Sequence, residues 1–505
     1  MAISPKVYQF LIGLFASLGS MVFGYDLGVI AGVIAAKTFI NEFHPNDDQT
    51  GLIVSLFTGG AFVGAALAAP TADYYGRRAT LFVGAVVFLI GGIVQTAAQG
   101  LSFLWGGRFV AGLGVGFLVM IVPLYQAELA HPSIRGRVTA LQQFMLGMGA
   151  FLAAWITYGT FVGVTTNSGQ WRIPLAIQNV PAIILAALIW LFPESPRWLI
   201  SKDKNDLGLK TLAVLHSSGD TSDAWVLREF QQIQDAVELD RQLEASSYLE
   251  LFKSKNTFRR VFLCCAVQAS IQMTGVAAIQ YYAPTIYGQI GISPSKTLMY
   301  QGISNAFALL GEMSCMSFID KLGRRWTMIG GMLAQMCTFL VATILLAKFK
   351  PEDNEKGKKA AQWAFIIITC WLFNFIFSAT SGSLSWIIPS EVFDTRTRAK
   401  GVSLATMTSF AFNTMIGQVV PRGMSHAGYR FYYLFVICNF TNALFFYFFL
   451  PETSRIPLED MNAVFNGSWL VPGTSKRQAA LRRQDVEAEA VFSKDTNKTE
   501  AIHGE

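Results

Sequence analysis

Three ionisable side chains lie inside long apolar stretches of the sequence: Asp26, Arg108 and Glu312. A charged group in hydrocarbon is costly, so such residues are usually paired or functional. Desolvation favours the protonated, neutral form of Asp26, and Arg108 is its expected partner. A permanent ion pair that only holds two helices together is the alternative. For Glu312 we favour a structural hydrogen bond to another helix over a site of proton exchange.

Uncharged polar and aromatic side chains in the same stretches form a second group of candidates. Gln143 and Gln272 carry amides, which donate and accept hydrogen bonds and are costly in hydrocarbon when unpaired. Trp386 follows a run of small residues and offers a flat apolar face. Amides beside an aromatic ring suit a neutral ligand with many hydroxyl groups. The plainer alternative is hydrogen bonds between helices for the glutamines and a core position for the tryptophan.

The elements that must hold these side chains are predicted to be membrane-spanning helices. Of the 505 residues, 52% are hydrophobic and 14% are charged, which is too apolar for an ordinary soluble protein. A spanning helix needs about 20 apolar residues. Twelve such stretches are predicted, at 10–31, 51–72, 79–98, 104–127, 138–162, 173–192, 260–287, 297–319, 326–348, 361–388, 401–420 and 429–450.

Basic residues cluster after the even-numbered stretches, as at Arg77 and Arg324, so these loops and both termini are predicted to be cytosolic. Apolar residues at helical spacing, interleaved with charges, predict short cytosolic helices between the sixth and seventh stretches. The predicted divisions are an N-terminal half at 1–193, linker helices at 194–258, a C-terminal half at 259–450 and a cytosolic tail at 451–505, disordered after about 476.

A pattern of charges at the ends of these stretches occurs twice, in the same order. The first copy comprises Asp73, Arg77, Arg78, Glu128, Arg135, Glu194 and Arg197, and the second comprises Asp320, Arg324, Arg325, Glu391, Arg398 and Glu452. Each copy contains three motifs, which include Asp73, Glu128 and Glu194 in the first copy and Asp320, Glu391 and Glu452 in the second. Three motifs repeated in the same order indicate a duplicated half rather than chance. The duplicated unit is a membrane unit, because each motif adjoins an apolar stretch.

Together these motifs resemble the sugar porter branch of the major facilitator superfamily, and within it the fungal monosaccharide transporters. The resemblance rests on Phe23-Gly24-Tyr25-Asp26, the two Gly-Arg-Arg loops, Gly107-Arg108, the run from Pro123 to Ala130 with Arg135-Gly136, Pro193-Glu194-Ser195-Pro196-Arg197 and Pro451-Glu452-Thr453. It covers about residues 10–465. It implies an all-α membrane protein with twelve transmembrane helices in two six-helix halves, and a transporter rather than an enzyme.

The resemblance also implies roles for single residues. Asp26 and Arg108 match the proton-coupling pair of bacterial relatives, with the proton as coupling ion and no other cofactor. Gln143, Gln272 and Trp386 match sugar-contacting positions. Further substrate-binding candidates are Gln280, Tyr281, Tyr282 and Asn413. The duplicated charges match cytosolic salt-bridge networks that act as an inner gate; the alternative is that they only set the topology.

The sequence departs from the family pattern in the seventh and tenth stretches. Ile271 and Ala277 stand where the family usually has a glutamine and an asparagine. Ser383 and Ser385 stand where it usually has prolines, so we expect a less broken helix there. These departures change the hydrogen-bonding pattern, and the particular sugar therefore cannot be copied from relatives.

The sequence therefore predicts proton-coupled uptake of a hexose or pentose by a multi-pass monomer of the plasma membrane. Its expected partners are a sugar and lipid, without nucleic acid or a metal site. An uncoupled facilitator, or a carrier of a sugar-like acid such as quinate or galacturonate, remains an alternative. A non-transporting sugar sensor is disfavoured, because only about 50 residues follow Pro451.

Overall fold

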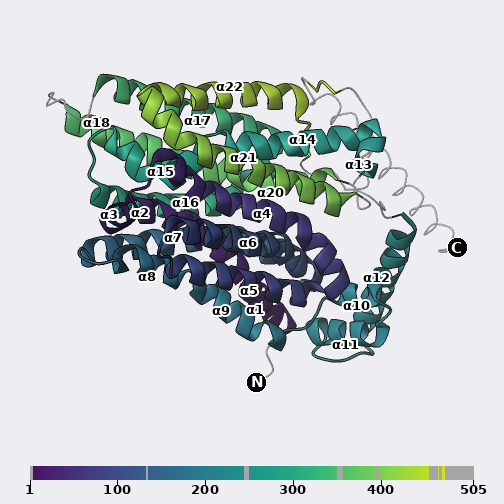
Figure 1. The fold of residues 1–505 in the computed structure, drawn as a ribbon. Helices are drawn as coiled ribbons and strands as arrows, with labels where there is room; N and C mark the ends of the chain where they lie inside the picture. The colour runs from purple at the N-terminus through teal and green to yellow at the C-terminus, as the bar shows by residue number, and fades with distance from the viewer. Residues whose placement is uncertain are drawn as a thin grey trace.

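The computed structural model describes residues 4–131, 135–243, 249–349, 357–393, 397–453, 465 and 469–471. Every regular element in these ranges is helical (Figure 1). The first nine helices are α1 (Pro5–Ala16), α2 (Leu18–Ala35), α3 (Lys37–Phe43), α4 (Asp47–Tyr75), α5 (Arg77–Thr96), α6 (Leu101–Leu129), α7 (Arg135–Gly163), α8 (Gly169–Ile177) and α9 (Asn179–Leu188).

Short helices follow, and then a second set of long ones. The short helices are α10 (Pro196–Ser201), α11 (Asn205–His216), α12 (Ala224–Leu243) and α13 (Glu250–Lys253). The second set is α14 (Lys255–Gln272), α15 (Val276–Gly288), α16 (Pro294–Leu322), α17 (Arg324–Lys348), α18 (Lys358–Ala364), α19 (Phe373–Phe377), α20 (Ser383–Val392), α21 (Arg398–Ala427) and α22 (Tyr432–Phe449).

Ten segments of the described chain are long and apolar enough to cross a membrane. One of them, Lys400–Phe449, spans 50 residues and includes most of α21 and all of α22. Helix α16 has 29 residues and is as long as α4. Adding α16 and counting α21 and α22 separately gives twelve long helical segments in the described ranges, which we call rods and number in chain order. The predicted all-α fold is confirmed.

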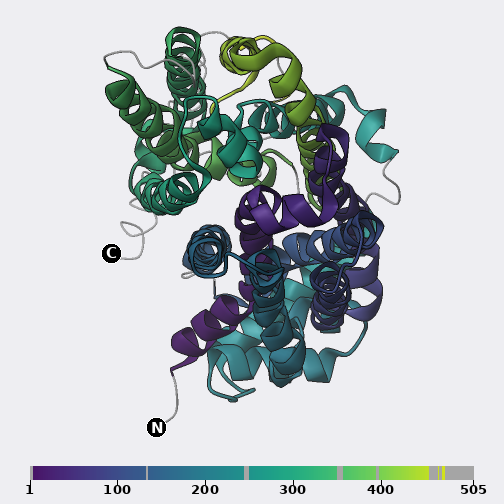
Figure 2. The ribbon, with the colours of Figure 1, turned by 60° about the vertical axis from the view of Figure 1, so that its left-hand side comes forward.

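The rods form two groups, which are separated most clearly in Figure 2. Within the first group α5 packs against α6 and α9, and within the second α17 packs against α22. Between the groups α4 packs against α21, α7 against α16 and α2 against α15. Helices α10 to α12 lie at one end of the bundle (Figure 1), where Trp198 Nε1 of α10 donates to the backbone oxygen of Asp73, 3.0 Å away. We call this the Asp73 end and the opposite end the Asp48 end.

The seventh rod is interrupted between α14 and α15, next to the predicted site residue Gln272. Helix α14 ends at Gln272, and Gly275 has a φ of +96°, in the left-handed region that favours glycine. A side chain at Gly275 would also collide with the ring of Phe339. The break directs the chain into α15 and leaves Gln272 at the end of a helix.

The tenth rod is continuous but not regular. The chain stays helical from Lys358 to Val392, yet it contains two π-helical segments, Phe365–Leu372 and Ser378–Gly382. The Ser383 hydroxyl donates to the backbone oxygen of Ser378, five residues earlier, at 2.8 Å. With serines at 383 and 385 the chain remains helical here, as expected. The helix nevertheless contains two π-helical segments, which were not expected. Such turns are frequent at functional sites.

The first six-helix half depends on close helix contacts, and a pair of alanine variants tests this. At Gly112 of α6 a methyl group would meet the backbone of Phe57 in α4, whereas at Gly59 of α4 it would meet open space. We expect G112A to lower the free energy of unfolding by about 1–3 kcal/mol, because neither backbone can give way. G59A should leave stability within about 0.5 kcal/mol of the wild type or raise it slightly. Thermal unfolding of the purified protein in detergent measures both, and equal melting temperatures would contradict the packing argument.

Candidate functional site

Asp26 of α2 and Arg108 of α6 are paired at the centre of the first half. Arg108 Nη1 donates to Asp26 Oδ1 at 2.5 Å, and both side chains have 0% exposure. Arg108 Nε also donates to the backbone oxygen of Ile53 in α4 at 2.8 Å, and its guanidinium lies 4.3 Å from the centre of the Phe57 ring. The predicted partnership is therefore present, and it ties three helices together.

The pair does not use all its hydrogen-bonding capacity. Asp26 Oδ2 and Arg108 Nη2 are buried and make no hydrogen bond within the described part of the chain. A buried carboxylate oxygen without a donor is costly unless it carries a proton or binds another group. Asp26 can thus hold a proton at Oδ2 while Oδ1 remains bonded to Arg108.

A chain of side-chain hydrogen bonds connects the seventh and eleventh rods. Tyr281 Oη donates to Asn413 Oδ1 at 3.0 Å, and Asn413 Nδ2 donates to Gln272 Oε1 at 2.8 Å. Gln272 Nε2 then donates to Ser409 Oγ at 2.9 Å. Three predicted candidates are therefore brought together. Ser409 was not predicted, although a hydroxyl in an apolar stretch was the available signal.

The remaining candidates of the second half, Gln280, Tyr282 and Trp386, have contacts separate from this chain of hydrogen bonds. Tyr282 Oη donates to the backbone oxygen of Gly417 at 2.6 Å. The side chain of Gln280 is half-buried, and its backbone oxygen accepts from Gln301 Nε2 at 3.1 Å. Trp386 of α20 is half-buried and packs against the main apolar core.

Gln143 lies in the other half and meets an acid rather than the amide chain. Its Nε2 on α7 donates to Glu312 Oε1 on α16 at 3.0 Å, so the bond crosses between the two halves. The expected hydrogen bond of Glu312 to another helix is therefore present. A second contact crosses the same interface, because Asn305 Nδ2 donates to the backbone oxygen of Ala150 at 2.9 Å.

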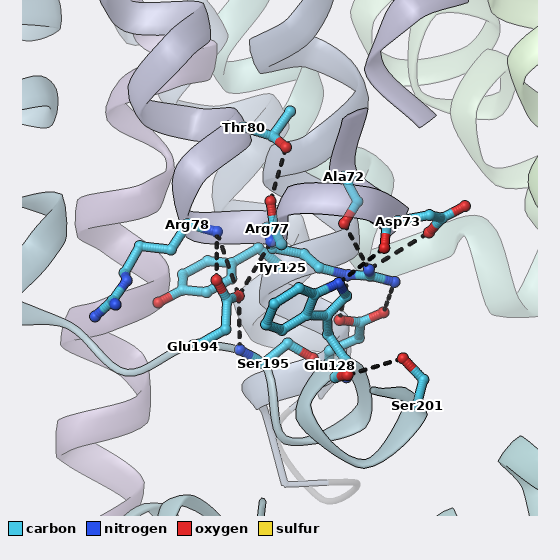
Figure 3. A network of polar contacts seen from close by, with 12 residues as sticks. Ala72, Asp73, Arg77, Arg78, Thr80, Tyr125, Glu128, Glu194, Ser195 and Ser201 are labelled. Atoms are coloured by element: carbon cyan, nitrogen blue, oxygen red, sulfur yellow. Dashed lines mark hydrogen bonds and ion pairs between the residues drawn. The ribbon is translucent and has the colours of Figure 1, made fainter. Parts of the chain in front are cut away.

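At the Asp73 end the first copy of the charge pattern forms a compact network (Figure 3). Arg77 donates through Nε and Nη2 to both oxygens of Glu128, at 2.9 and 3.0 Å. Glu194 accepts from the backbone N–H groups of Arg77, Arg78 and Ser195 at 3.1, 3.2 and 2.9 Å. Its carboxylate thereby caps the first turn of α5. Burial raises the pKa of Glu194, and the backbone donors and the charge of Arg78 oppose that rise.

The second copy repeats this geometry in the other half. Arg324 Nη2 donates to Glu391 Oε1 at 2.9 Å. Glu452 accepts from the backbone N–H groups of Arg324 and Arg325 at 2.7 and 3.1 Å, and so caps the first turn of α17. The duplicated sequence pattern therefore produces two equivalent arrangements, each joining residues of one half.

The other predicted gate residues have varied positions. Arg77 Nη1 lies 3.4 Å from Asp73 Oδ1, and Arg78 Nη1 donates to the backbone oxygen of Phe192 at 3.0 Å. Arg325 Nη2 donates to the backbone oxygen of Tyr447 at 2.6 Å. Arg197 is half-buried in the first turn of α10. The side chains of Arg135, Asp320 and Arg398 lie outside the described part of the structure.

Sequence reasoning missed a polar seam between the halves at the Asp48 end. Arg422 of α21 pairs with Asp48 of α4, with Nη2 donating to Oδ2 at 2.7 Å. Ser55 Oγ donates to Gln418 Oε1 at 2.9 Å. One turn further on, the hydroxyls of Thr58 and Thr414 lie 2.8 Å apart. The only signal in the sequence was the opposite charges of Asp48, just before the stretch 51–72, and Arg422, just after the stretch 401–420. Nothing in the sequence indicates that these two residues are partners.

The fold and the buried charges define a multi-pass membrane protein of the major facilitator type. A family model described as "Sugar (and other) transporter" matches residues 12–465. The chain belongs to this family.

The relatives with similar sequences are also transporters. The chain is 33% identical to the MFS glucose transporter mfs1 of Aspergillus flavus, covering 96% of this chain and 95% of the relative. It is 32% identical to the MFS-type transporter criB of Aspergillus cristatus, covering 93% and 96%. It is 30% identical to a quinate permease of Emericella nidulans, covering 90% and 88%.

Solved structures of the xylose transporter XylE from E. coli share the fold. The partially occluded inward open conformation superposes with a TM-score of 0.75 at 22% identity, covering 89% of this chain and all of the other. The proton:xylose symporter XylE bound to 6-bromo-6-deoxy-D-glucose gives a TM-score of 0.74 at 23% identity, covering 91% and 99%.

Removing the two capping carboxylates tests whether each half depends on its own network. We expect E194A and E452A each to lower the free energy of unfolding by about 1–3 kcal/mol, because helix N–H groups lose their acceptor. Glutamine at either position should cost less, since it keeps one acceptor oxygen. The control E229A alters a half-buried acid of α12 and should shift stability by no more than about 0.5 kcal/mol. Thermal unfolding measures the series, and alanine variants no less stable than E229A would contradict the capping role.

Proposed function

We propose that the chain carries a monosaccharide, a hexose or a pentose, together with a proton across the plasma membrane by alternating access. Membership of the sugar transporter family supports a carrier, and the relatives named as glucose transporters support a sugar. The observation that carries proton coupling is the fully buried Asp26–Arg108 pair. The working unit is a monomer, since one chain supplies both halves.

Proton coupling requires a group whose charge changes during the cycle. Protonation of Asp26 at Oδ2 removes its negative charge, so the bond from Arg108 to Oδ1 weakens from an ion pair to a hydrogen bond with a neutral acid, while Arg108 keeps its bond to the backbone oxygen of Ile53. This loosens α2 from α6 and alters the balance between two conformations, which is all that a bound proton can do. A released proton restores the pair. Coupling then follows if the sugar binds more tightly to one of these two states.

The sugar is proposed to bind between the halves, where the amides of Gln272 and Asn413 now bond to each other. In the absence of ligand these amides satisfy one another, and a sugar hydroxyl can replace either partner because it donates and accepts. Tyr281 is positioned to follow the change through its bond to Asn413. Trp386 supplies the apolar face for the sugar ring.

Alternating access is proposed to move residues 1–193 against residues 259–450. The polar seam at the Asp48 end joins the halves, while the charged networks described at the Asp73 end each join residues within one half. We propose that the Asp73 end faces the cytosol, together with α10 to α13 and both termini. The charged networks then meet across that end when the seam at the Asp48 end opens, and they form the inner gate.

A carrier of a sugar-like acid is the second candidate, because a quinate permease is 30% identical to this chain. An uncoupled facilitator is the same carrier with a permanent Asp26–Arg108 pair. Both alternatives share the fold and the family, so transport measurements must separate them.

Uptake of radiolabelled sugars in a host without its own hexose carriers tests the proposal. The panel is glucose, xylose, arabinose, galactose, galacturonate and quinate, each with and without an uncoupler. A potential of about 100 mV supplies about 2.3 kcal/mol per proton, so wild type should accumulate a sugar up to about fifty-fold. The uncoupler should bring this ratio to about one.

D26N should reduce accumulation to about one even without uncoupler, because an asparagine cannot exchange a proton. It should still exchange labelled for unlabelled sugar across the membrane. The control D206N changes an exposed acid in α11 and should accumulate sugar as wild type does. Uptake that resists the uncoupler, with D26N behaving as D206N does, would show an uncoupled facilitator.

A further inference from the structure

Glu312 is a buried acid that the proposed proton pair does not use. Its residue exposure is 9%, and its Oε1 accepts from Gln143 Nε2, which comes from the opposite half of the molecule. Its Oε2 is buried and makes no hydrogen bond within the described part of the chain. Buried polar atoms usually have partners, so an unsatisfied oxygen at a moving interface points to an absent partner.

On α7 this oxygen lies directly against a glycine. Gly147 lies one turn beyond Gln143, and a methyl group added there would come within 2.8 Å of Glu312 Oε2 and 2.7 Å of Leu309 Cδ2, so the two helices pack closely at this point. Residues 141–146 of α7 are all half-buried, so this stretch borders open space or lipid. The amide of Gln143 and the free oxygen of Glu312 therefore lie next to each other on facing helices.

The charge near Glu312 restricts what that partner is. Among the described side chains Glu312 contacts an amide and forms no ion pair, and the buried cation Arg108 is already bonded to Asp26 and Ile53. An ionised Glu312 repels an anionic ligand, and a protonated one offers it no positive charge. A neutral hydroxyl can donate a hydrogen bond to Glu312 whether Glu312 is ionised or protonated, because both forms of a carboxyl group have an acceptor oxygen.

We propose that Glu312 and Gln143 form a hydroxyl-binding pair that contacts the substrate from both halves and selects neutral sugars over sugar acids. This rests on the proposed function, in which the substrate binds between the halves. Glu312 then determines specificity in two ways: its negative charge repels a sugar acid, and its oxygen accepts a hydrogen bond from a neutral sugar. The pair would thereby decide between neutral sugars and sugar-like acids, the two substrate classes that the family resemblance leaves open.

Competition between a sugar and its own acid tests the proposal. Inhibition constants of glucose and glucuronate are measured against uptake of the labelled sugar that wild type transports best, in wild type, E312Q, E312L, G147A and N305A. Wild type should bind glucuronate at least about a hundredfold more weakly than glucose. E312Q keeps an acceptor oxygen and removes the charge, so this ratio should fall about tenfold.

E312L should raise the KM for sugar about tenfold, because the hydroxyl loses its acceptor. G147A keeps the carboxyl group but places a methyl group against Oε2 and Leu309, so it displaces the carboxyl group and should also raise KM. N305A removes the other hydrogen bond between α16 and α7, so it controls for a loosened interface and should leave the glucuronate-to-glucose ratio unchanged. Membrane levels and melting temperatures of all variants are compared, so that loss of folding is separated from loss of binding.

Two results would overturn the inference and leave carrier function standing. One is sugar uptake in which E312Q and E312L keep the wild-type ratio and KM. The other is a wild type that prefers glucuronate or quinate to glucose. A wild type that transports no compound in the panel overturns both this inference and the proposed function.

Discussion

The guanidinium of Arg108 has no exposed surface in a bundle that spans a membrane. Neighbouring groups must therefore compensate its positive charge. Asp26 supplies the opposite charge, Ile53 a backbone oxygen and Phe57 a ring face. Three helices therefore converge on one side chain. Removing a partner from a buried charge is strongly destabilising, so the pair is a structural tie, and in the proposed mechanism it is also the group on which the proton acts.

Each half also closes its own Asp73 end. A carboxylate that follows the last rod of the half returns to cap a helix, Glu194 on α5 and Glu452 on α17. An arginine in the first turn of each capped helix then reaches an acid of a third helix, Glu128 or Glu391. These contacts join residues within each half, and the two groups of helices meet where α4 packs against α21 and α7 against α16. In the proposed alternating access, relative motion concentrates at these interfaces. The α4–α21 interface carries hydrogen bonds between neutral groups and an ion pair between partly exposed ones, whereas the α7–α16 interface includes the buried acid Glu312.

The interface residues connect specificity with motion. Gln143 and Glu312 belong to different halves, and so do Ser55 and Gln418. In contrast, Gln272, Asn413 and Tyr281 form a connected group within the second half. A ligand that contacts both groups is sensitive to the separation of the halves. In the proposed mechanism this links binding energy to conformational change without any contact between the ligand and the charged networks at the Asp73 end.

Local patterns in the chain were sufficient for the rods and for the repeated networks. Hydrophobic length predicted the spanning helices, because hydrocarbon requires each backbone to satisfy its own hydrogen bonds. The duplicated motif predicted two networks of opposite charges, and the structure pairs Arg77 with Glu128 and Arg324 with Glu391 in them. Contacts without a repeat were not predictable in this way: the seam between Asp48 and Arg422, the place of Ser409 in the amide chain, and the π turns before Ser383.

By itself the sequence determined which residues are too polar for a bilayer, namely Asp26, Arg108, Gln143, Gln272 and Glu312. The residue type and the apolar stretch around it are enough to identify a polar group that needs a partner in the bilayer. The tertiary structure decided which of them meet. The pair of Asp26 with Arg108 had been expected from the sequence. The pairs of Gln272 with Asn413 and of Gln143 with Glu312 had not, because helix packing selects the partners of a buried group over separations of 141 and 169 residues.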